Sequence, residues 1–501
     1  MGVIKRQSIK QGLVTYLGIL IGTISTLFVY PRLALEKFGE IQFIIGLAAF
    51  FVPFIGIGLP AVAIHFFPYF KENKESRGRF LFILLLTTFL SLIICSTLIY
   101  FTQNLVGYYF SANAYLFSNY LPYILAITFC TTFITLLHAY ISNFNRIVVP
   151  SIIYNLSLKI LQPILVLIYL AGFIAFTNIL DGLVVIYIAI VFFTVYYLRH
   201  LGYLDINLKR INTEGDLKRK IIDYSLFSIL INVGGTLALQ LDKLLIGFMI
   251  GSRSLAIFTI PVLITEAIDV IRKAISGVSA PIVSDSLKSN DMHNVNVIYK
   301  KSALLQFVIG MFLLIGAWIC ADDLYHIMPK GKEFSEGKII ILILGLSRLI
   351  DMLTGINTEI IAFSNYYRAN LYMLLLLAVV NIASNYLLIP LYGINGAALA
   401  TLTSMFFFNA AKLIFIYKKL NIHPFSRSMI GAVFIALFTL FIAYLIPTFQ
   451  MEAINNNVLS SILTIFIKGI IISICYFSLL WKFKISEDIN QIIDNVFKKI
   501  F

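Results

Sequence analysis

Long apolar segments separated by short polar loops dominate the sequence. A helix needs about 20 mostly apolar residues to cross a hydrocarbon core of about 30 Å. Windows of that length predict fourteen membrane-spanning helices. They lie near residues 12–32, 40–69, 80–102, 119–141, 148–170, 179–198, 221–250, 254–284, 299–320, 338–362, 370–390, 395–417, 428–447 and 458–481.

The connecting loops alternate in charge along the chain. With the N-terminus inside, the cytoplasmic side would carry most loop cations: Lys5, Arg6, Lys10, Lys71–Arg79, Arg146, Arg199–Lys220, Lys288, Lys300, Lys301, Arg368, Lys418, Lys419 and Arg427. The opposite loops at 103–119, 391–394 and 447–458 contain no Lys or Arg. The exception is Ala321–Lys338, whose three lysines are offset by four acidic residues. This positive-inside pattern predicts that both termini are cytoplasmic.

The most polar stretch, Arg199–Lys220, follows six predicted spans and precedes eight. It predicts a linker between an N-terminal lobe at 1–220 and a C-terminal lobe at 221–420, with the last two spans and a cytoplasmic tail at 421–501. A shift of 217 residues superimposes similar patterns of spans, charged turns and Lys-Asn loops, so we expect an internal duplication. Such repeats, with a binding site at their interface, are typical of secondary transporters.

Composition supports the membrane setting. Of the 501 residues, 60% are hydrophobic and 12% are charged, whereas a soluble domain has about 25% charged residues. The basic N-terminal segment leads into a first span without a small-residue cleavage site, so we expect a retained helix and no cleaved signal peptide. The net charge of +14 is dispersed over loops, which fits anionic headgroups and excludes nucleic acid as the expected partner. The four cysteines show no paired spacing for disulfides or metal binding.

Four charged residues interrupt the apolar segment Ser254–Ser284. Glu266, Asp269, Arg272 and Lys273 fall within an arc of about 120° on a helix. Because one ionised side chain near the bilayer centre costs at least about 2.5–3.5 kcal/mol, this stripe must face protein or water. It predicts a polar pathway inside the membrane.

The stripe has two interpretations. Arg272 and Lys273 could bind a phosphate, or Glu266 and Asp269 could neutralise them in a structural network, since Asp269 is spaced i,i+3 and i,i+4 from both cations. The two acids and two bases sum to zero, so surplus positive charge would have to come from elsewhere.

Other charges inside predicted spans are further candidates. Asp242 and Lys243 are adjacent and point about 100° apart, so at most one faces a cavity squarely. Arg348, Asp351 and Glu359 share a face of one predicted helix, where Glu359 could bind a coupling proton or sodium ion or form an ion-paired helix contact.

The remaining candidates are isolated in the sequence. Lys159 lacks a local partner, and Arg32 is either an exit-side phosphate contact or an interfacial anchor. His65, His138 and Lys468 are interpreted first as satisfied or snorkelling groups, although Lys468 could line a groove for a lipid tail.

The C-terminal segment Ile485–Phe501 repeats apolar residues at helical spacing, with acidic residues early and lysines late. It predicts an amphipathic helix on the inner membrane surface, with docking on a partner enzyme as the alternative.

Three stretches resemble the polysaccharide-biosynthesis flippases, which are related to O-antigen and lipid II flippases within the multidrug/oligosaccharidyl-lipid/polysaccharide exporter superfamily. The stretches are Glu36–Gly39, Gln240–Gly247, and Asn381–Asn385 running into Leu388–Ala398. With fourteen predicted spans, the resemblance covers essentially the whole chain.

The resemblance implies an all-α membrane protein with two six-helix lobes arranged as a V and two further C-terminal helices. The cavity would be lined by the first, second, seventh and eighth spans. The substrate would be an undecaprenyl-diphosphate-linked glycan, flipped across the bacterial inner membrane by alternating access without covalent chemistry. We expect no cofactor, possible coupling to a proton or sodium gradient, contact with membrane lipids and assembly enzymes, and a monomer.

The candidate residues divide into two groups under this hypothesis. Substrate binding would involve Arg272, Lys273, Lys243, Arg348, Lys159 and Arg32. A cavity network or ion coupling would involve Asp242, Glu266, Asp269, Asp351 and Glu359.

Three other classes of protein are compared with a flippase. A multidrug or cation antiporter of the same fold would be expected to use an acidic residue in the N-terminal lobe, yet the first, second, fourth and fifth predicted spans lack one between their ends. A polymerase or ligase would need a larger outer loop. A scaffold without transport activity would not explain the buried charges.

Overall fold

The computed structural model describes residues 2–109, 114–205, 215–446, 457–487, 489–491 and 494. In hydrocarbon, every backbone N–H and C=O must be bonded within its own segment, so continuous apolar runs form helices. The described residues form helices and no strand, which confirms the predicted all-α fold. Two compact units divide the chain between Leu255 and Ala256.

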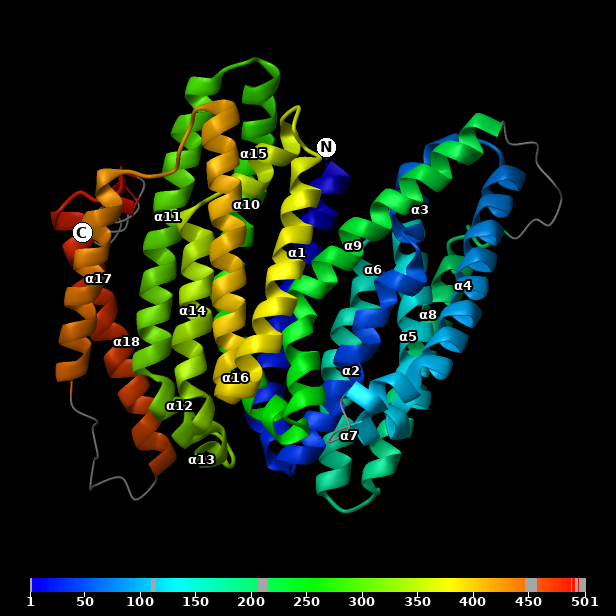
Figure 1. Cartoon of the computed structure of the whole chain (residues 1–501), viewed down its shortest axis with the longest axis horizontal. Coiled ribbons are helices and arrows are strands. Elements are labelled where there is room, and N and C mark those ends of the chain that lie inside the picture. The colour runs from blue at the N-terminus through cyan, green and yellow to red at the C-terminus, as the bar shows by residue number, and fades with distance from the viewer. Residues whose placement is uncertain are drawn as a thin grey trace. The chain divides into compact units, whose positions relative to one another are not determined.

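The described part of the first unit contains nine α-helices, which Figure 1 labels where there is room. They are α1 (Gly2–Ile24), α2 (Leu35–Gly56), α3 (Leu59–His65), α4 (Lys74–Tyr109), α5 (Ala114–Ser142), α6 (Val148–Ser151), α7 (Ser157–Leu170), α8 (Phe176–His200) and α9 (Gly215–Met249). Helix α5 is the centre of this unit, since it packs against α2, α3, α4 and α8.

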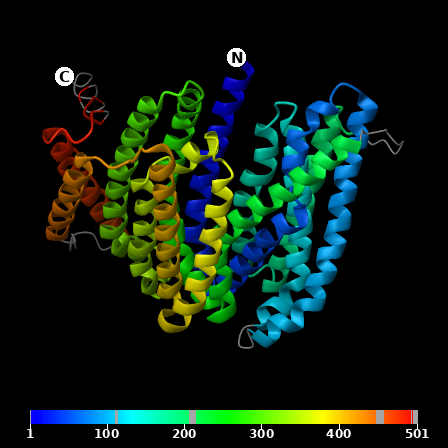
Figure 2. The ribbon, with the colours of Figure 1, turned by 45° about the horizontal axis from the view of Figure 1, so that its top comes forward.

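Nine more α-helices follow, of which the first begins four residues before the division. They are α10 (Ser252–Lys288), α11 (Met292–Ile319), α12 (Ala321–Ile327), α13 (Gly331–Phe334), α14 (Lys338–Leu353), α15 (Asn357–Phe363), α16 (Ala369–Leu420), α17 (Arg427–Leu445) and α18 (Asn457–Lys482). Helices α11, α14, α17 and α18 surround an apolar core, and Figures 1 and 2 show them side by side.

Eleven described helices are long and apolar enough to cross a membrane, or up to thirteen if each bent pair counts as one span. The predicted count of fourteen is therefore not confirmed. One reason is that α16 covers two predicted spans in a single element. It is kinked at Gly393, whose φ of 57° and ψ of −133° are not helical and fall where glycine is tolerated.

The division at Leu255 differs from the predicted lobe boundary at Lys220. Helix α9 packs against α2 and α3 of the first unit. Its Gly247 lies directly on the ring of Phe43, and its Ser225 hydroxyl donates to the carbonyl oxygen of Ile57. The polar loop marks a change in composition, but the packing of α9 determines where the compact unit ends.

Contacts at the helix ends agree with the predicted alternation of loops. Asp205, which follows α8, pairs with Arg77 and Lys74 at the start of α4. At the other ends of the helices, the Lys37 ammonium donates to the Tyr169 hydroxyl at 2.6 Å. Loops predicted for one side of the membrane thus meet one another within the first unit.

A buried ion pair joins α12 to α18. The Lys468 ammonium lies 2.7 Å from a carboxylate oxygen of Asp323, and both side chains are only 7% exposed. The segment 321–338, interpreted from the sequence as an outer loop, is largely helical and supplies this acid. Lys468 is therefore a buried cation whose charge is compensated, which agrees with its interpretation from the sequence as a satisfied group.

Part of the predicted amphipathic tail lies outside the described residues, so the structure does not test that helix. The described Ser486 is buried, and the Lys301 ammonium lies 3.4 Å from a carboxylate oxygen of Glu487.

Candidate functional site

Charged side chains from α10 and α14 meet inside the second unit. The Arg272 Nε atom lies 2.7 Å from Asp269 Oδ1 and 3.1 Å from Asp351 Oδ2. The Lys273 ammonium lies 2.9 Å from Asp269 Oδ2. We name Asp269, Arg272, Lys273 and Asp351 the charged cluster. It contains two acids and two bases, so it is neutral overall.

Arg272 is held through one edge of its guanidinium. Among the described residues, its Nη atoms make no hydrogen bond, and the side chain is 23% exposed. Two buried carboxylates therefore fix the direction of the guanidinium while its Nη edge stays available. A guanidinium edge of this kind can donate two parallel hydrogen bonds to a phosphate.

Asp351, rather than Glu266, is the second acid of the charged cluster. Glu266 is exposed and forms no ion pair within the described part of the chain. On α10, the buried Asp269 thus contacts both Arg272 and Lys273. Arg272 also reaches Asp351 on α14. Sequence spacing alone identified the Asp269 contacts but not the contact across helices.

The helix that carries Asp351 is broken directly after it. Helices α14 and α15 are bent by 44° at Thr354–Ile356, whereas the sequence predicts one continuous helix at 338–362. Gly355 adopts φ +63°, which lies outside the right-handed helical region and therefore ends α14. Glycine tolerates this conformation, whereas other residues rarely do. Arg348 and Asp351 therefore do not share one continuous helix face with Glu359.

Polar side chains fill the break. Asn357 donates to Thr354 and to Asn409 of α16, each at 3.0 Å, and the Thr354 hydroxyl donates to Asn409 at 2.9 Å. All three side chains are buried. Broken helices at membrane depth commonly place polar groups around substrate or ion sites.

Lys412 of α16 is the most buried cation at this break and was not identified from the sequence. It is 2% exposed, its ammonium donates to the Thr358 hydroxyl at 2.6 Å, and it lies 3.6 Å from the centre of the Phe408 ring. It lies within electrostatic range of Asp351 and Glu359. It could supply the positive charge that the neutral cluster lacks.

Two further candidates lie near the break. The Arg348 Nε atom is buried and has no hydrogen-bond partner among the described residues, and its guanidinium is within electrostatic range of Asp269. Glu359 is half-buried on α15, within electrostatic range of Arg272 and Lys412. Among the described residues, Glu359 forms no ion pair.

The remaining cationic candidates belong to the first unit. Lys159 of α7 lies against Gly18 and Gly22 of α1. Arg32 is exposed at the end of a 3-10 turn. Neither they nor Lys243 form an ion pair within the described ranges.

Three other candidates are placed by packing. Asp242 of α9 is buried and Lys243 is half-buried, as their different directions predict. His65 stacks on Tyr224 with ring centres 4.3 Å apart. The Nε2 atom of His138 is buried without a hydrogen bond in the described part of the structure.

An acidic residue does lie inside a span of the first unit. Helix α2 begins at Leu35, before the predicted start at residue 40, so Glu40 is in its second turn. Its carboxylate accepts a hydrogen bond from the Tyr120 hydroxyl at 2.7 Å. The expectation that these spans lack an internal acid is wrong because the first polar turns of α2 are helical.

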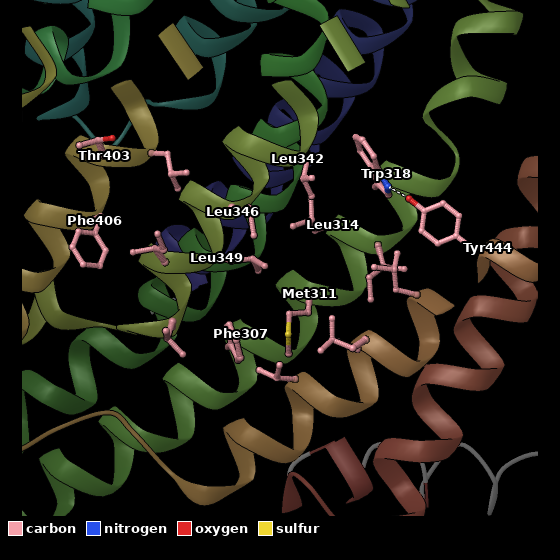
Figure 3. A pocket seen from close by; sticks show the side chains of 18 residues that line it. Phe307, Met311, Leu314, Trp318, Leu342, Leu346, Leu349, Thr403, Phe406 and Tyr444 are labelled. Atoms are coloured by element: carbon pink, nitrogen blue, oxygen red, sulfur yellow. Dashed lines mark hydrogen bonds between the residues drawn. The ribbon is translucent and has the colours of Figure 1, made fainter. Parts of the chain in front are cut away.

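An apolar pocket of about 840 Å³ lies between α11, α14, α16 and α17 (Figure 3). Met311, Leu346 and Phe406 point into it, and the Trp318 indole donates to the Tyr444 hydroxyl at its edge. Among the described residues that line this pocket, none is charged.

Replacing Gly355 by Ala is expected to destabilise the second unit. A Cβ atom there would lie 2.8 Å from the Cβ of Ala303, and a left-handed backbone costs a residue other than glycine about 1–3 kcal/mol. Thermal unfolding in detergent would show a lower midpoint. The matched control is Gly277→Ala on α10, where a Cβ meets nothing within 4 Å. A Gly355→Ala midpoint equal to that of the control would contradict the strained break.

Comparison with known proteins identifies the fold. No family model matches the sequence. The structure is similar to the lipid II flippase MurJ in an inward closed conformation, with a TM-score of 0.69 and 14% identity over 94% of this chain and 99% of that chain. It is also similar to an inward-facing multidrug resistance MATE transporter of the MOP superfamily, with a TM-score of 0.65 and 13% identity over 81% of this chain and 94% of that chain.

One curated relative is similar in sequence. The capsular polysaccharide biosynthesis protein CapF of Staphylococcus aureus is 28% identical over 174 residues, which is 34% of this chain. The match spans 43% of the length of that relative.

These similarities define the class of fold: a multi-pass, all-helical membrane protein with the architecture shared by lipid II flippases and MATE transporters. The all-α membrane fold that the three sequence stretches imply is thereby confirmed, whereas the count of fourteen spans is not.

Proposed function

We propose that the protein flips an undecaprenyl-diphosphate-linked oligosaccharide from the inner to the outer leaflet of the bacterial cytoplasmic membrane by alternating access. The oligosaccharide would be a repeat unit of capsule, O-antigen or exopolysaccharide. The similarity to a lipid II flippase and the partial similarity to a capsular polysaccharide biosynthesis protein both support this class of substrate.

The observation that carries the proposal is the apolar pocket beside α17. A polyprenyl tail is an apolar chain that must stay in a dry environment while its headgroup crosses the membrane. The match to the lipid II flippase covers 94% of this chain. Residues 421–501 form about a sixth of the chain, which is more than the unmatched share, so the match extends into the segment that supplies α17. The pocket would hold part of the tail.

The charged cluster would serve the diphosphate. A phosphate leaving water needs cationic hydrogen-bond donors in exchange for lost hydration. The Nη edge of Arg272 offers such donors, with Lys273 exposed beside it and the buried Lys412 within electrostatic range. Coupling to a proton or sodium gradient stays a prediction, with Glu359 as its candidate.

A cation or drug antiporter is the second candidate function. Glu40 supports it, because it places a carboxylate within a span of the first unit. An antiporter of small cations would have no need of a pocket for a polyprenyl tail, so narrowing that pocket distinguishes the two functions.

Filling the pocket is expected to block flipping. In a strain that lacks the gene, lipid-linked oligosaccharide should accumulate on the inner leaflet, and the wild-type gene should clear it. The double variant Leu346→Trp and Leu437→Trp should fail to clear it, since both side chains line the pocket. Ile339→Trp and Ile430→Trp on the same two helices lie outside the pocket lining and provide the matched control. Normal clearance by the correctly inserted pocket variant would refute the tail site.

A further inference from the structure

A second pocket, in the first unit, has no role in the proposed transport. It has a volume of about 530 Å³ and lies between α3, α4 and α9, beside the break that separates α2 from α3. We name it the α4–α9 pocket.

The walls of the α4–α9 pocket are mostly apolar and reach the surface of the unit. Phe70, Phe80 and Leu84 form its buried side. Ile83 and Ile222 are 42% and 50% exposed, so the pocket opens outward through large apolar side chains. On a helix that crosses a membrane, such an opening faces lipid acyl chains.

Two cations from different helices complete the lining. Arg79 of α4 and Lys218 of α9 are the charged members, and no acidic residue is found among the described residues that line the pocket. Arg79 lies over the ring of Phe82, with its guanidinium carbon 5.4 Å from the ring centre. Lys218 is exposed.

The predicted spans place both cations near the depth of lipid headgroups. Arg79 and Lys218 immediately precede the apolar runs that begin near residues 80 and 221. Their loops belong to the predicted cytoplasmic side, where anionic lipids attract basic residues. One end of the pocket therefore suits a phosphate and the other suits an acyl chain.

We infer that the α4–α9 pocket binds an anionic diacyl phospholipid from the cytoplasmic leaflet. The lipid phosphate would lie between Arg79 and Lys218, and one acyl chain would lie against Ile83, Ile222 and Leu226. The choice of leaflet rests on the predicted topology, whereas the site itself is independent of the proposed function. The charge of the rim favours an anionic over a zwitterionic lipid.

Native mass spectrometry of the full chain in detergent tests the site. With phosphatidylglycerol as the probe, the wild type should show a bound lipid that phosphatidylcholine does not replace at equal concentration. The double variant Arg79→Gln and Lys218→Gln should bind phosphatidylglycerol about 30-fold more weakly, as expected for the loss of two cations near the membrane surface. Ile222→Trp should also weaken binding, because it fills the acyl end without changing charge.

The matched control is Lys288→Gln with Arg427→Gln, which removes two exposed cations of the same predicted side outside the pocket. The control should bind phosphatidylglycerol like the wild type. The inference would be overturned if the pocket variants bound phosphatidylglycerol as tightly as the wild type does. It would also be overturned if the wild type bound phosphatidylcholine as tightly as phosphatidylglycerol. It would also fail if undecaprenyl diphosphate displaced phosphatidylglycerol from the wild type at equal concentration.

Discussion

Replacing Lys468 by Met will strongly destabilise the protein. The substitution leaves the Asp323 carboxylate buried without its cation, and breaking a buried pair in this way costs about 3–5 kcal/mol. Circular dichroism during heating in detergent should show a clearly lower unfolding midpoint for Lys468→Met than for the wild type.

The second ion pair of the same region provides the control. Lys338 lies 2.6 Å from Asp322, but that carboxylate is 58% exposed, so Lys338→Met should cost no more than about 1 kcal/mol. The double variant Lys468→Met with Asp323→Asn should regain part of the lost stability, because no uncompensated charge stays buried. Equal midpoints for the two lysine variants would show that Asp323 finds water or another partner.

Replacing Arg272 by Gln is expected to abolish most of the transport. Loss of a charge-assisted hydrogen bond to the bound anion costs about 1.5–3 kcal/mol, which corresponds to a decrease of about 10- to 150-fold in flipping. The variant should also be less stable, because Asp351 stays buried without its contact to Arg272. Flipping should be measured from lipid-linked oligosaccharide on each leaflet and expressed per folded protein.

A double variant separates binding from structure. Arg272→Gln with Asp351→Asn removes both charges of one contact, so stability should recover while flipping stays low. Lys273→Gln should keep near-normal stability, because its side chain is 68% exposed. If the double variant regains flipping, Arg272 is only a counter-ion for Asp351.

The sequence predicted the charged cluster better than the break beside it. Asp269, Arg272 and Lys273 are close in sequence, and helical spacing alone brings them together. Asp351 is on another helix, so its contact with Arg272 depends on packing that no local pattern encodes. Gly355 stands between Thr354 and Asn357 inside a predicted span, and a single glycine within a helical pattern is tolerated and gives no clear signal of a helix end.

Lys412 was overlooked for a related reason. It stands six and seven residues before Lys418 and Lys419, near a predicted helix end, where a lysine ordinarily extends toward the membrane surface. The structure instead turns it inward onto Thr358 and Phe408. The feature of the sequence that could have identified Lys412 is that it is the one charged residue within the predicted span 395–417.

The lobe boundary shows the same limit. Arg199–Lys220 is polar enough to predict a linker, and nothing in its composition shows that α9 packs on α2. That contact depends on the absence of a Cβ atom at Gly247, where the ring of Phe43 lies, and local composition does not show such a fit of shapes. The polarity of Arg199–Lys220 predicted a connecting segment, whereas the packing of α9 on α2 determines where the first unit ends.

The pair between Asp323 and Lys468 also sets an order of events during synthesis. The two residues are 145 positions apart, so at about 5–20 residues per second the ribosome delivers the lysine roughly 7–30 s after the acid. Throughout that interval Asp323 must stay near the aqueous boundary or find a temporary partner. A chain truncated before α18 would keep the Asp323 carboxylate permanently without the cation that compensates it in the full structure.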